Sequence, residues 1–429
     1  MTTKLTRIAE KARADRKLRF TSLAHLLTPE FLLETWKQMN HKGASGVDGE
    51  TTKEFESDLE TRVKQLCERL KARQYRPLPV RRVEIPKSDG KTRPLGIPTV
   101  EDRLLQRAVA RILSAIYEQD FVELSYGFRP GRNAHQALRA LRTHFVVGKV
   151  RHVYEADIRG YFNHINHEWL RKMVAHRIAD PIILSLVGKW LRAGVMQDGV
   201  VVRAHEGSPQ GGPVSPVLAN IYLHYVLDLW FERKFKTECQ GEAYLVRFAD
   251  DFVACFQYKR DAERLDRTLK WRMEKFSLEL APEKTRMLLF GRFARETKAE
   301  YGEKPETFEF LGFMHVCGTD ANGKTAIVRI PSTKSCRKFL DRTHEWLVRH
   351  MHWKRRDQQR HLASMLRGFY QYFALHHCAS KLYWLFNEVV RQWCRSLRRR
   401  SQRHRMFWSY LKSRSWFELP RPKLLHPSV

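Results

Sequence analysis

The strongest constraint on the fold of this chain is a thirteen-residue stretch, residues 244–256, with the sequence YLVRFADDFVACF. Apolar and β-branched residues run up to Asp250 and Asp251 and resume directly after them, which predicts two short strands joined by a tight turn. Such a turn would present both carboxylates at one end of a sheet. Because Asp favours turns by bonding to its own backbone, this stretch alone is most simply interpreted as a pair of solvated turn residues.

A second stretch, residues 153–170 with the sequence VYEADIRGYFNHINHEWL, adds a third carboxylate. Asp157 ends an apolar segment and is followed by Gly160, Tyr161 and Phe162 and then by a helical pattern. If the two strands are neighbours, Asp157 and Asp250 meet at one sheet edge. Three oxygen ligands there would hold two Mg²⁺ ions about 4 Å apart, the arrangement that binds the attacking and leaving oxygens in phosphoryl transfer.

The order of the motifs is more specific than any one of them. ADIRGYF, GSPQGGPVSPVLANIYL (residues 207–223) and FADD follow one another along the chain. This ordered set resembles the palm of a reverse transcriptase of the bacterial group II intron type, and the resemblance extends over roughly residues 20 to 410. It implies an α+β chain with right-hand polymerase architecture, in which fingers and palm of antiparallel sheet and helices precede an α-helical thumb and maturase domain.

The resemblance divides the chain into four parts. They are a basic helical extension with a template-contacting loop (1–50), fingers and palm (51–330), the thumb and maturase domain (331–412) and a short tail (413–429). It assigns catalysis to Asp157, Asp250 and Asp251, and metal binding to these three residues together with Ile158. The implied activity is RNA-directed DNA polymerisation with two Mg²⁺ ions, for which Mn²⁺ is an alternative.

Several other residues match family positions that bind the incoming nucleotide. Two strand-like runs flank the turn SDGK at residues 88–91, which predicts a hairpin with Lys87 and Arg93 on opposite arms. These cations would bind the triphosphate, whereas a charged hairpin without this role is a solvated edge. Phe162 would lie under the sugar and collide with a 2′-hydroxyl, Gln210 would hold the new base pair, and Lys284 matches a basic residue close to the catalytic centre. The alternatives are a core phenylalanine and a surface lysine.

The glycine-rich loop of residues 207–213 runs directly into a predicted helix. Ser215 is expected to cap this helix and Pro216 to occupy its first position. The loop glycines would let the backbone approach a base pair closely. A second glycine-rich loop, residues 43–50, is either a template contact or a connector.

The contacts with RNA and with the primer and template are assigned more broadly. Arg129 and Arg132 are expected to touch backbone phosphates, or else simply to aid solubility. The aromatic run of residues 308–316, with a glycine inside the expected strand, resembles the element that grips the primer end. The complete set of assigned contacts is Arg129, Arg132, Gly211, Leu311, Gly312, Arg398, Arg399 and Arg400.

The charge of the chain points to a polyanionic partner. The formal net charge is +31, and residues 332–429 hold 22 Lys and Arg against 5 Asp and Glu, which indicates a nucleic acid. Apolar residues in this region recur at helical spacing, which predicts three or more helices with an aromatic seam. The predicted seam residues are Leu362, Leu366, Phe369, Phe373, Leu382, Phe386, Val389, Trp393 and Leu397. The arginine-rich block of residues 395–405 suits an RNA backbone.

The expected partners are an RNA template with structured intron RNA, a DNA primer and dNTPs. The N-terminus lacks the apolar stretch of a secretory signal, no apolar run is long enough for a membrane span, and the seven cysteines are scattered, so we expect a cytoplasmic protein with reduced thiols. The sequence leaves the oligomeric state open. The family's usual Tyr before the paired acids is replaced by Phe248, and the short tail predicts the absence of an HNH endonuclease.

Other functions remain open at this point. The chain could act mainly as a maturase that binds intron RNA and assists splicing. It could also be a free-standing relative in DNA repair, phage defence or CRISPR spacer acquisition. An RNA-dependent RNA polymerase would share the paired acids but would not favour a bulky residue at Phe162, and a purely structural RNA-binding protein would not need the three carboxylates.

Overall fold

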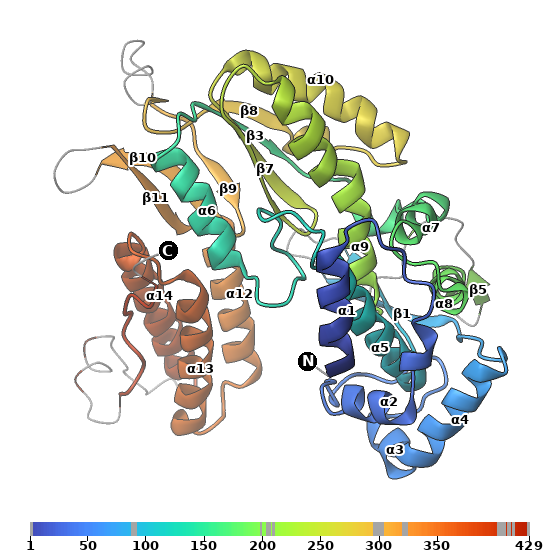
Figure 1. Ribbon diagram of the computed structural model, residues 1–429. Coiled ribbons are helices and arrows are strands. Elements are labelled where there is room, and N and C mark those ends of the chain that lie inside the picture. Colours follow the sequence, from blue (N-terminus) through green and yellow to red (C-terminus); the bar gives the residue numbers. More distant parts are fainter. Residues whose placement is uncertain are drawn as a thin grey trace. The chain divides into compact units, whose positions relative to one another are not determined.

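The computed structural model shows a chain that mixes helices with β-sheets, which confirms the expected α+β class (Figure 1). It describes residues 3–86, 92–197, 200–202, 207, 211–294, 304–319, 325–400, 409, 413 and 417–426. The chain forms two compact units. Unit 1 contains Met1–Ala137, Ala156–Ala254 and Arg260–Arg286, and unit 2 contains Leu138–Glu155, Cys255–Lys259 and Met287–Val429. The four functional ranges given above stay predictions.

The first half of unit 1 is built around one long helix, α5 (Val100–Tyr117). Thr99 caps it by accepting a hydrogen bond from the Asp102 backbone N–H. Its residues are buried on nearly all sides because other helices of unit 1 pack against it. These neighbours are α1 (Thr3–Ala14), α2 (Pro29–Trp36) and α3 (Thr52–Ser57), and α4 (Leu59–Lys71) packs in turn against α2 and α3. A 3₁₀ turn, η1 (Ala24–Leu26), precedes α2.

The predicted hairpin around residues 88–91 is confirmed. Strands β1 (Val80–Pro86) and β2 (Thr92–Ile97) pair in antiparallel fashion, with Arg93 opposite Ile85. Two short strands, β4 (Val195–Gln197) and β5 (Val200–Val202), extend the sheet in the order β2-β1-β4-β5. Lys87 lies outside the described residues.

The second half of unit 1 carries the paired acids. Strands β6 (Ala243–Phe248) and β7 (Asp251–Phe256) are neighbours in a sheet of order β6-β7-β3-β8, which also contains β3 (His152–Ala156) and β8 (Arg286–Leu289). Strands β3, β7 and β8 each contribute residues to both units. The helices are α7 (His167–Ala175), α8 (Pro181–Leu191), α9 (Ser215–Leu223) and α10 (Lys259–Lys275). Helix α9 continues into two π-helical turns, η3 (His224–Asp228) and η4 (Phe231–Phe235), and three 3₁₀ turns complete the set: η2 (Tyr161–Asn163), η5 (Lys236–Glu238) and η6 (Pro282–Lys284).

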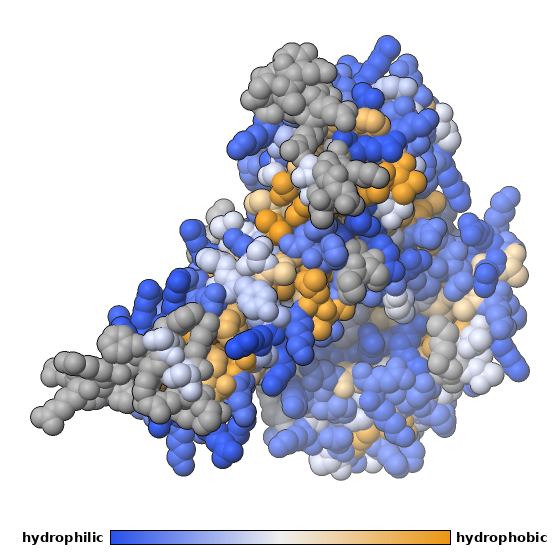
Figure 2. Space-filling model, turned by 90° about the vertical axis from the view of Figure 1, so that its left-hand side faces the viewer, coloured by the Kyte–Doolittle hydropathy of each residue, from blue (hydrophilic) through white to orange (hydrophobic). Residues whose placement is uncertain are grey.

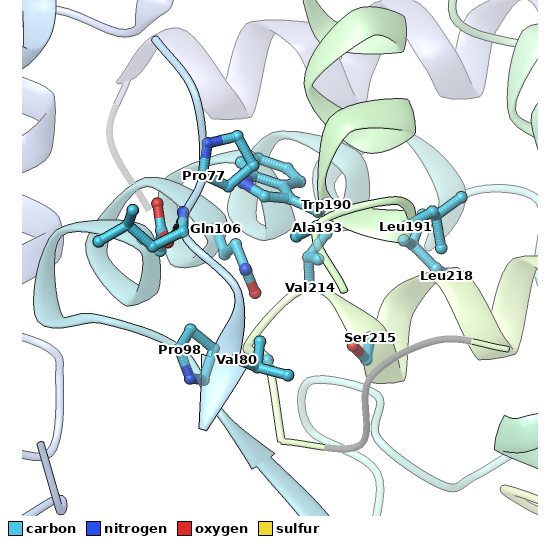
Figure 3. Close-up of a pocket in the computed structure, with 13 residues that line it drawn as sticks. Pro77, Val80, Pro98, Gln106, Trp190, Leu191, Ala193, Val214, Ser215 and Leu218 are labelled. Carbon is cyan, nitrogen blue, oxygen red and sulfur yellow. Dashed lines mark hydrogen bonds between the residues drawn. The ribbon is translucent and has the colours of Figure 1, made fainter. Parts of the chain in front are cut away.

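The start of α9 differs from the prediction. Val214, not Ser215, is the N-cap, and no side-chain capping bond is formed at this end. Ser215 is instead the first helical residue, because its N–H is turned back onto the carbonyl of Gly212 at 3.1 Å. Beside it lies a cavity of about 10 Å³, between Pro77 and Pro98 on one side and Leu191 and Leu218 on the other (Figure 3). This volume is about that of one water molecule, so the cavity holds no nucleotide.

Unit 2 combines a three-stranded sheet with a set of helices. The sheet has the order β11-β10-β9, formed by β9 (Phe308–Phe310), β10 (Phe313–Thr319) and β11 (Thr325–Pro331). Helix α6 (Ala134–Val146) lies mostly in this unit, and three helices follow the sheet, α12 (Thr333–Arg349), α13 (Arg355–Phe373) and α14 (Ala379–Arg398), as Figure 1 shows. The prediction of three or more C-terminal helices is confirmed. Of the nine predicted seam residues, all are buried except Phe373, which is half-buried.

The predicted strand with an internal glycine, residues 308–316, is wrong. Leu311 and Gly312 have φ values of +51° and +77° and form a two-residue turn between β9 and β10, which pair in antiparallel fashion. Positive φ at both central residues is typical of the hairpin turn whose twist matches the flanking strands. The turn was not predicted because aromatic residues continue on both sides of Gly312, so that the sequence resembles one continuous strand.

Figure 2 shows one face of the molecule, on which hydrophobic residues lie in small groups among hydrophilic ones. Within the part of the chain that the structure describes, no helix combines the length and apolarity needed to cross a bilayer.

Candidate active site

The paired acids lie at the turn between β6 and β7, as predicted. Asp250 is half-buried in the turn, and Asp251 is exposed as the first residue of β7. Ala249, just before them, has a φ of +58°, which non-glycine residues rarely adopt outside turns and functional sites. The turn is therefore tight, and it separates the environments of the two carboxylates.

Asp157 follows β3 directly and is anchored by residues 279–284. Its backbone carbonyl accepts a hydrogen bond of 2.8 Å from the N–H of Ala281, and Ile158 forms an antiparallel bridge with Leu280. This pairing brings Lys284 to the acid, since the Lys284 ammonium forms an ion pair with the Asp157 carboxylate. The hydrogen bond to Asp157 raises the pKa of Lys284, and the charge of Asp251 adds to the effect.

Electrostatic coupling joins Asp157 and Asp250 in one site. The pKa of Asp250 is raised, first because burial disfavours its charged form and further because the Asp157 carboxylate repels it. The guanidinium groups of Arg93 and Arg247 oppose this rise. The structure therefore brings together Asp157, Asp250, Arg93 and Lys284, four residues that were assigned to the site from sequence.

The carboxylates fit a magnesium site that the substrate completes. Among the described residues, no three His, Cys, Asp or Glu side chains lie close enough together to hold a metal ion. Mg²⁺ commonly takes one or two carboxylates and fills its remaining positions with water and substrate phosphates. Asp157 and Asp250 supply such a pair, and a bound cation would relieve the repulsion that raises the pKa of Asp250.

A residue that the sequence interpretation missed lies beneath this turn. Arg247, in β6, is 1% exposed and pairs with Asp228, which is fully buried. All five N–H groups of its guanidinium have acceptors within the protein. They are both carboxylate oxygens of Asp228 (2.7 and 2.5 Å), the side-chain oxygen of Asn220 (3.0 Å), the carbonyl of Ala249 (2.8 Å) and the hydroxyl of Ser125 (2.8 Å).

Arg247 thus connects three segments that are far apart in the sequence. The bond to the Ala249 carbonyl fixes the residue before Asp250, and backbone bonds of 2.9 Å join Arg247 to Leu124 and Tyr126. Gly127 packs so closely on this turn that a Cβ atom there would lie 2.2 Å from the Ala249 nitrogen. A charged residue between apolar neighbours in a buried strand was the only sequence signal for this arrangement.

The remaining nucleotide-binding assignments have varied placements. Phe162 is 7% exposed and lies against Tyr161, with ring centroids 5.3 Å apart, and its role as a steric gate stays a prediction. Gln210, like Lys87, lies outside the described residues. Gly211 has a φ of +126°, and a Cβ atom there would lie 2.3 Å from the Gly96 carbonyl. The close approach that requires this glycine is therefore to strand β2.

The two arginines assigned to phosphate contacts are engaged within unit 1. Arg129 is 7% exposed; it forms an ion pair with Glu118 at 3.0 Å and donates to the carbonyls of Val122 and Ser125. The guanidinium of Arg132 is half-buried over the Tyr126 ring, 5.5 Å from its centroid. Arg129 and Arg132 thus contact residues 122–126, which lie beside the strand that leads to Asp250. Their contact with phosphate stays a prediction.

The assigned contacts in unit 2 fall into two groups. The turn at Leu311 and Gly312 is held by the helices, since the Leu311 carbonyl accepts from the Tyr372 hydroxyl and the Gly312 carbonyl accepts from the Ser335 hydroxyl. Arg398 and Arg399 are exposed at the end of α14. Arg400 is half-buried and donates to the Trp353 carbonyl at 2.6 Å.

The glycine-rich loop of residues 43–50 packs against its own unit. A Cβ atom at Gly46 would lie 2.6 Å from the Cα of Thr99, and the Arg81 guanidinium donates twice to the Ser45 carbonyl. These contacts account for the glycine at this position, and a template contact stays a prediction.

The region that carries this site is similar to known proteins. A sequence profile of the reverse transcriptase (RNA-dependent DNA polymerase) family matches residues 85–315. The chain is 41% identical over 225 residues to Protein YkfC of Escherichia coli strain K12, covering 51% of this chain and 59% of that protein. It is 38% identical over 237 residues to the Group II intron-encoded protein LtrA of Lactococcus lactis subsp. cremoris, covering 54% and 39%.

A plant protein extends the comparison to maturases. The chain is 26% identical over 174 residues to Nuclear intron maturase 2, mitochondrial, of Arabidopsis thaliana, covering 32% of this chain and 24% of that protein. The matches thus span less than two thirds of the length of each of these relatives. Because the family profile covers more than half of the chain, over the residues that form the site, this chain belongs to the reverse transcriptase family and is similar to its group II intron members.

Proposed function

We propose that this chain is an RNA-directed DNA polymerase that extends a primer with dNTPs on an RNA template. The observation that carries the proposal is the joint presence of Asp157, Asp250, Arg93 and Lys284 in one site of a reverse transcriptase family member. The proposal includes the right-hand arrangement, with fingers and palm between residues 51 and 330 and the thumb after them. Alternating carboxylates and cations suit a substrate that carries both metal ions and phosphates.

The carboxylates would bind the metal ions, and the lysine and arginine side chains would bind phosphates. Asp157 and Asp250, with Asp251 in support, would hold two Mg²⁺ ions, which supply charge neutralisation and activation of the primer 3′-hydroxyl. Lys284 forms an ion pair with Asp157 and would be available to a phosphate if cations bind that carboxylate. Arg93 lies close enough to Asp250 to affect its pKa and would bind the triphosphate together with Lys87.

Sugar and base recognition are assigned to neighbouring residues. Phe162, in the 3₁₀ turn η2 that follows Asp157 in the chain, would exclude a 2′-hydroxyl, and Gln210 and Gly211 would hold the new base pair. A polymerase with this gate prefers dNTPs to rNTPs. The preference is the property that separates this proposal from an RNA-dependent RNA polymerase.

A second candidate function is assistance of intron splicing through RNA binding. The exposed arginines at the end of α14 and the excess of basic residues after residue 331 support it, as does the similarity to a group II intron-encoded protein and to a nuclear intron maturase. Basic helices of this kind bind RNA backbones with little sequence preference. The two functions are compatible in one chain.

Primer extension on an RNA template with Mg²⁺ tests the proposal. Wild type should extend the primer with dNTPs and far less with rNTPs, and the double variant Asp250→Ala, Asp251→Ala should extend neither while keeping its RNA affinity. Extension by the double variant at the wild-type rate would contradict the assignment of Asp250 and Asp251 to catalysis. Absence of extension by wild type, with tight and salt-sensitive RNA binding, would favour the splicing function.

A further inference from the structure

A second surface of unit 1 has the features of a ligand site. A pocket of about 300 Å³ lies between α10 and the π-helical turn η4, with Trp230 and Trp271 in its lining and Lys234 and Arg267 beside them. Figure 1 shows α10 alongside the helix that continues from α9. None of these residues takes part in the active site described above.

The wall of this pocket is fixed by an irregular helix. In the π-helical turn η3 the hydrogen bonds skip one residue further than in an α-helix, which frees carbonyl groups for other donors. Arg272 uses two of them, donating to the carbonyls of Val226 and Tyr225. Its guanidinium is thereby held 5.1 Å from the centroid of the Trp230 ring. The aromatic wall is therefore in place before any ligand binds.

The other side of the pocket is formed by Trp271, an indole side chain that is largely exposed to solvent. Trp271 is 64% exposed, although a large apolar ring gains free energy on leaving water. The Lys275 ammonium lies 5.4 Å from its ring centroid and leaves most of the ring accessible. An exposed indole beside a pocket is available for stacking with a flat ligand.

The charges around the rings are positive and available. Lys234 and Arg267 are both exposed, and neither pairs with an acidic side chain among the residues that the structure describes. The acid in the lining, Glu238, is paired with Arg264 at 3.3 Å. The pocket therefore combines a flat aromatic surface with two cations that lack counter-ions.

We propose that this pocket binds one unstacked nucleotide of single-stranded RNA, with the base on Trp271 and its phosphate between Lys234 and Arg267. Unstacked bases are commonly held on aromatic rings and arginine planes by RNA-binding proteins. The volume lies at the lower end of ligand sites and suits one nucleotide. The inference rests on the proposed function in one respect, that RNA is the partner of this chain. The net charge of +31 favours this occupant over a protein segment.

The test measures RNA binding separately from catalysis. A twelve-nucleotide single-stranded RNA with 5-iodouridine at alternate positions is photo-crosslinked to the full chain, and the crosslinked peptides are identified by mass spectrometry. The same RNA with a fluorescent label gives Kd for wild type, Trp271→Ala, Trp271→Phe and the double variant Lys234→Gln, Arg267→Gln. Arg260→Gln, an exposed charge near the start of the same helix, is the matched control.

The expected results follow from stacking and charge. Crosslinks should map to Trp271 or Trp230, and Trp271→Ala should weaken binding about tenfold, since stacking one base contributes about 1–3 kcal/mol. Trp271→Phe should retain most of the affinity because its ring still stacks. The double charge variant should lower the slope of log Kd against log salt by about two, whereas Arg260→Gln, which removes one charge outside the pocket, should leave the slope nearly unchanged.

The outcomes separate this inference from the polymerase proposal. Equal affinities of Trp271→Ala and wild type, or crosslinks confined to other elements, would overturn the pocket assignment even if primer extension succeeds. Such a result would favour a protein partner as the ligand of the exposed Trp271 indole. Crosslinks at Trp271 in a protein that extends no primer would support RNA binding in the pocket and would contradict only the polymerase proposal.

Discussion

At Arg247 a buried charge is fully compensated, and the turn that carries Asp250 depends on it. Its partner Asp228 is 0% exposed and accepts two of its five hydrogen bonds. Removing one partner of a buried pair leaves the other charge without compensation, which costs about 3–5 kcal/mol. We therefore expect Asp228→Ala to lower the free energy of unfolding by about 3–5 kcal/mol, measured by denaturant titration. The control, Glu168→Ala, removes an exposed partner of Lys172 and should change stability little.

Arg247→Lys tests whether this charge positions the turn that carries Asp250. Lysine keeps the charge but cannot bond at once to Asp228, Ala249 and Ser125. We expect kcat for primer extension to fall about 10–100-fold, as for residues that orient metal ligands. The Mg²⁺ concentration for half-maximal rate should rise, while KM for dNTP stays near the wild-type value. An unchanged kcat in a variant with a normal unfolding midpoint would assign Arg247 a purely structural role.

The raised pKa of Asp250 predicts opposite effects on stability and activity. Because the folded protein binds the proton of Asp250 more tightly than the unfolded chain does, ionisation of this group destabilises the fold as pH rises above its unfolded pKa. Asp250→Asn should therefore raise Tm at pH 7.5, and this gain should shrink towards low pH, where the wild-type group is protonated in both states. The same variant should lose at least about a hundredfold in kcat. A lower Tm for Asp250→Asn at pH 7.5 would contradict the assignment.

At the scale of elements, sequence patterns of a few residues predicted those strands and turns that are determined by neighbouring residues. The apolar and β-branched runs around Asp250 and the strand-like runs around residues 88–91 predicted the two hairpins, because strand composition and turn chemistry are encoded within a few residues. The turn at Leu311 and Gly312 was missed because apolar residues continue on both sides. The first residue of α9 was misplaced because Ser215 is a good cap by type, yet the backbone turn from Gly212 starts the helix one residue earlier.

Two glycines of unit 2 give opposite predictions at this scale. Gly312 has a φ of +77°, and a Cβ atom there would lie 3.0 Å from the Ser335 hydroxyl, so Gly312→Ala should destabilise by about 1–2 kcal/mol. Gly368 lies within α13, where a Cβ atom would meet nothing within 4 Å, and Gly368→Ala should stabilise by about 0.5–1 kcal/mol. Unfolding midpoints of both variants should move in opposite directions from wild type. A shift of the same sign in both would contradict the turn.

At the scale of the whole molecule, the sequence predicts a partner class and a chemistry, but it did not predict the contacts between distant segments that hold the site. The three carboxylates, Arg93 and Lys284 were assigned to one site from motif order, and the structure brings Asp157, Asp250, Arg93 and Lys284 together. The pairing of Arg247 with Asp228 could not be predicted, since it depends on how a π-helical turn places a side chain against a strand. The pocket beside Trp271 was missed for the same reason: its two walls come from separate helices.

The net charge of +31 makes a quantitative prediction for the whole chain. A protein that neutralises several phosphates releases counterions, so RNA affinity should fall by about 10³–10⁵ between 50 and 200 mM salt if six to ten phosphates are contacted. The double variant Arg398→Gln, Arg399→Gln should reduce the salt slope by up to about two, because both side chains are exposed at the end of α14. Lys64→Gln with Lys71→Gln, two exposed charges on α4, is the matched control. If the two double variants change the slope equally, RNA binding depends on total charge; a larger change for the α14 pair assigns the RNA backbone to unit 2.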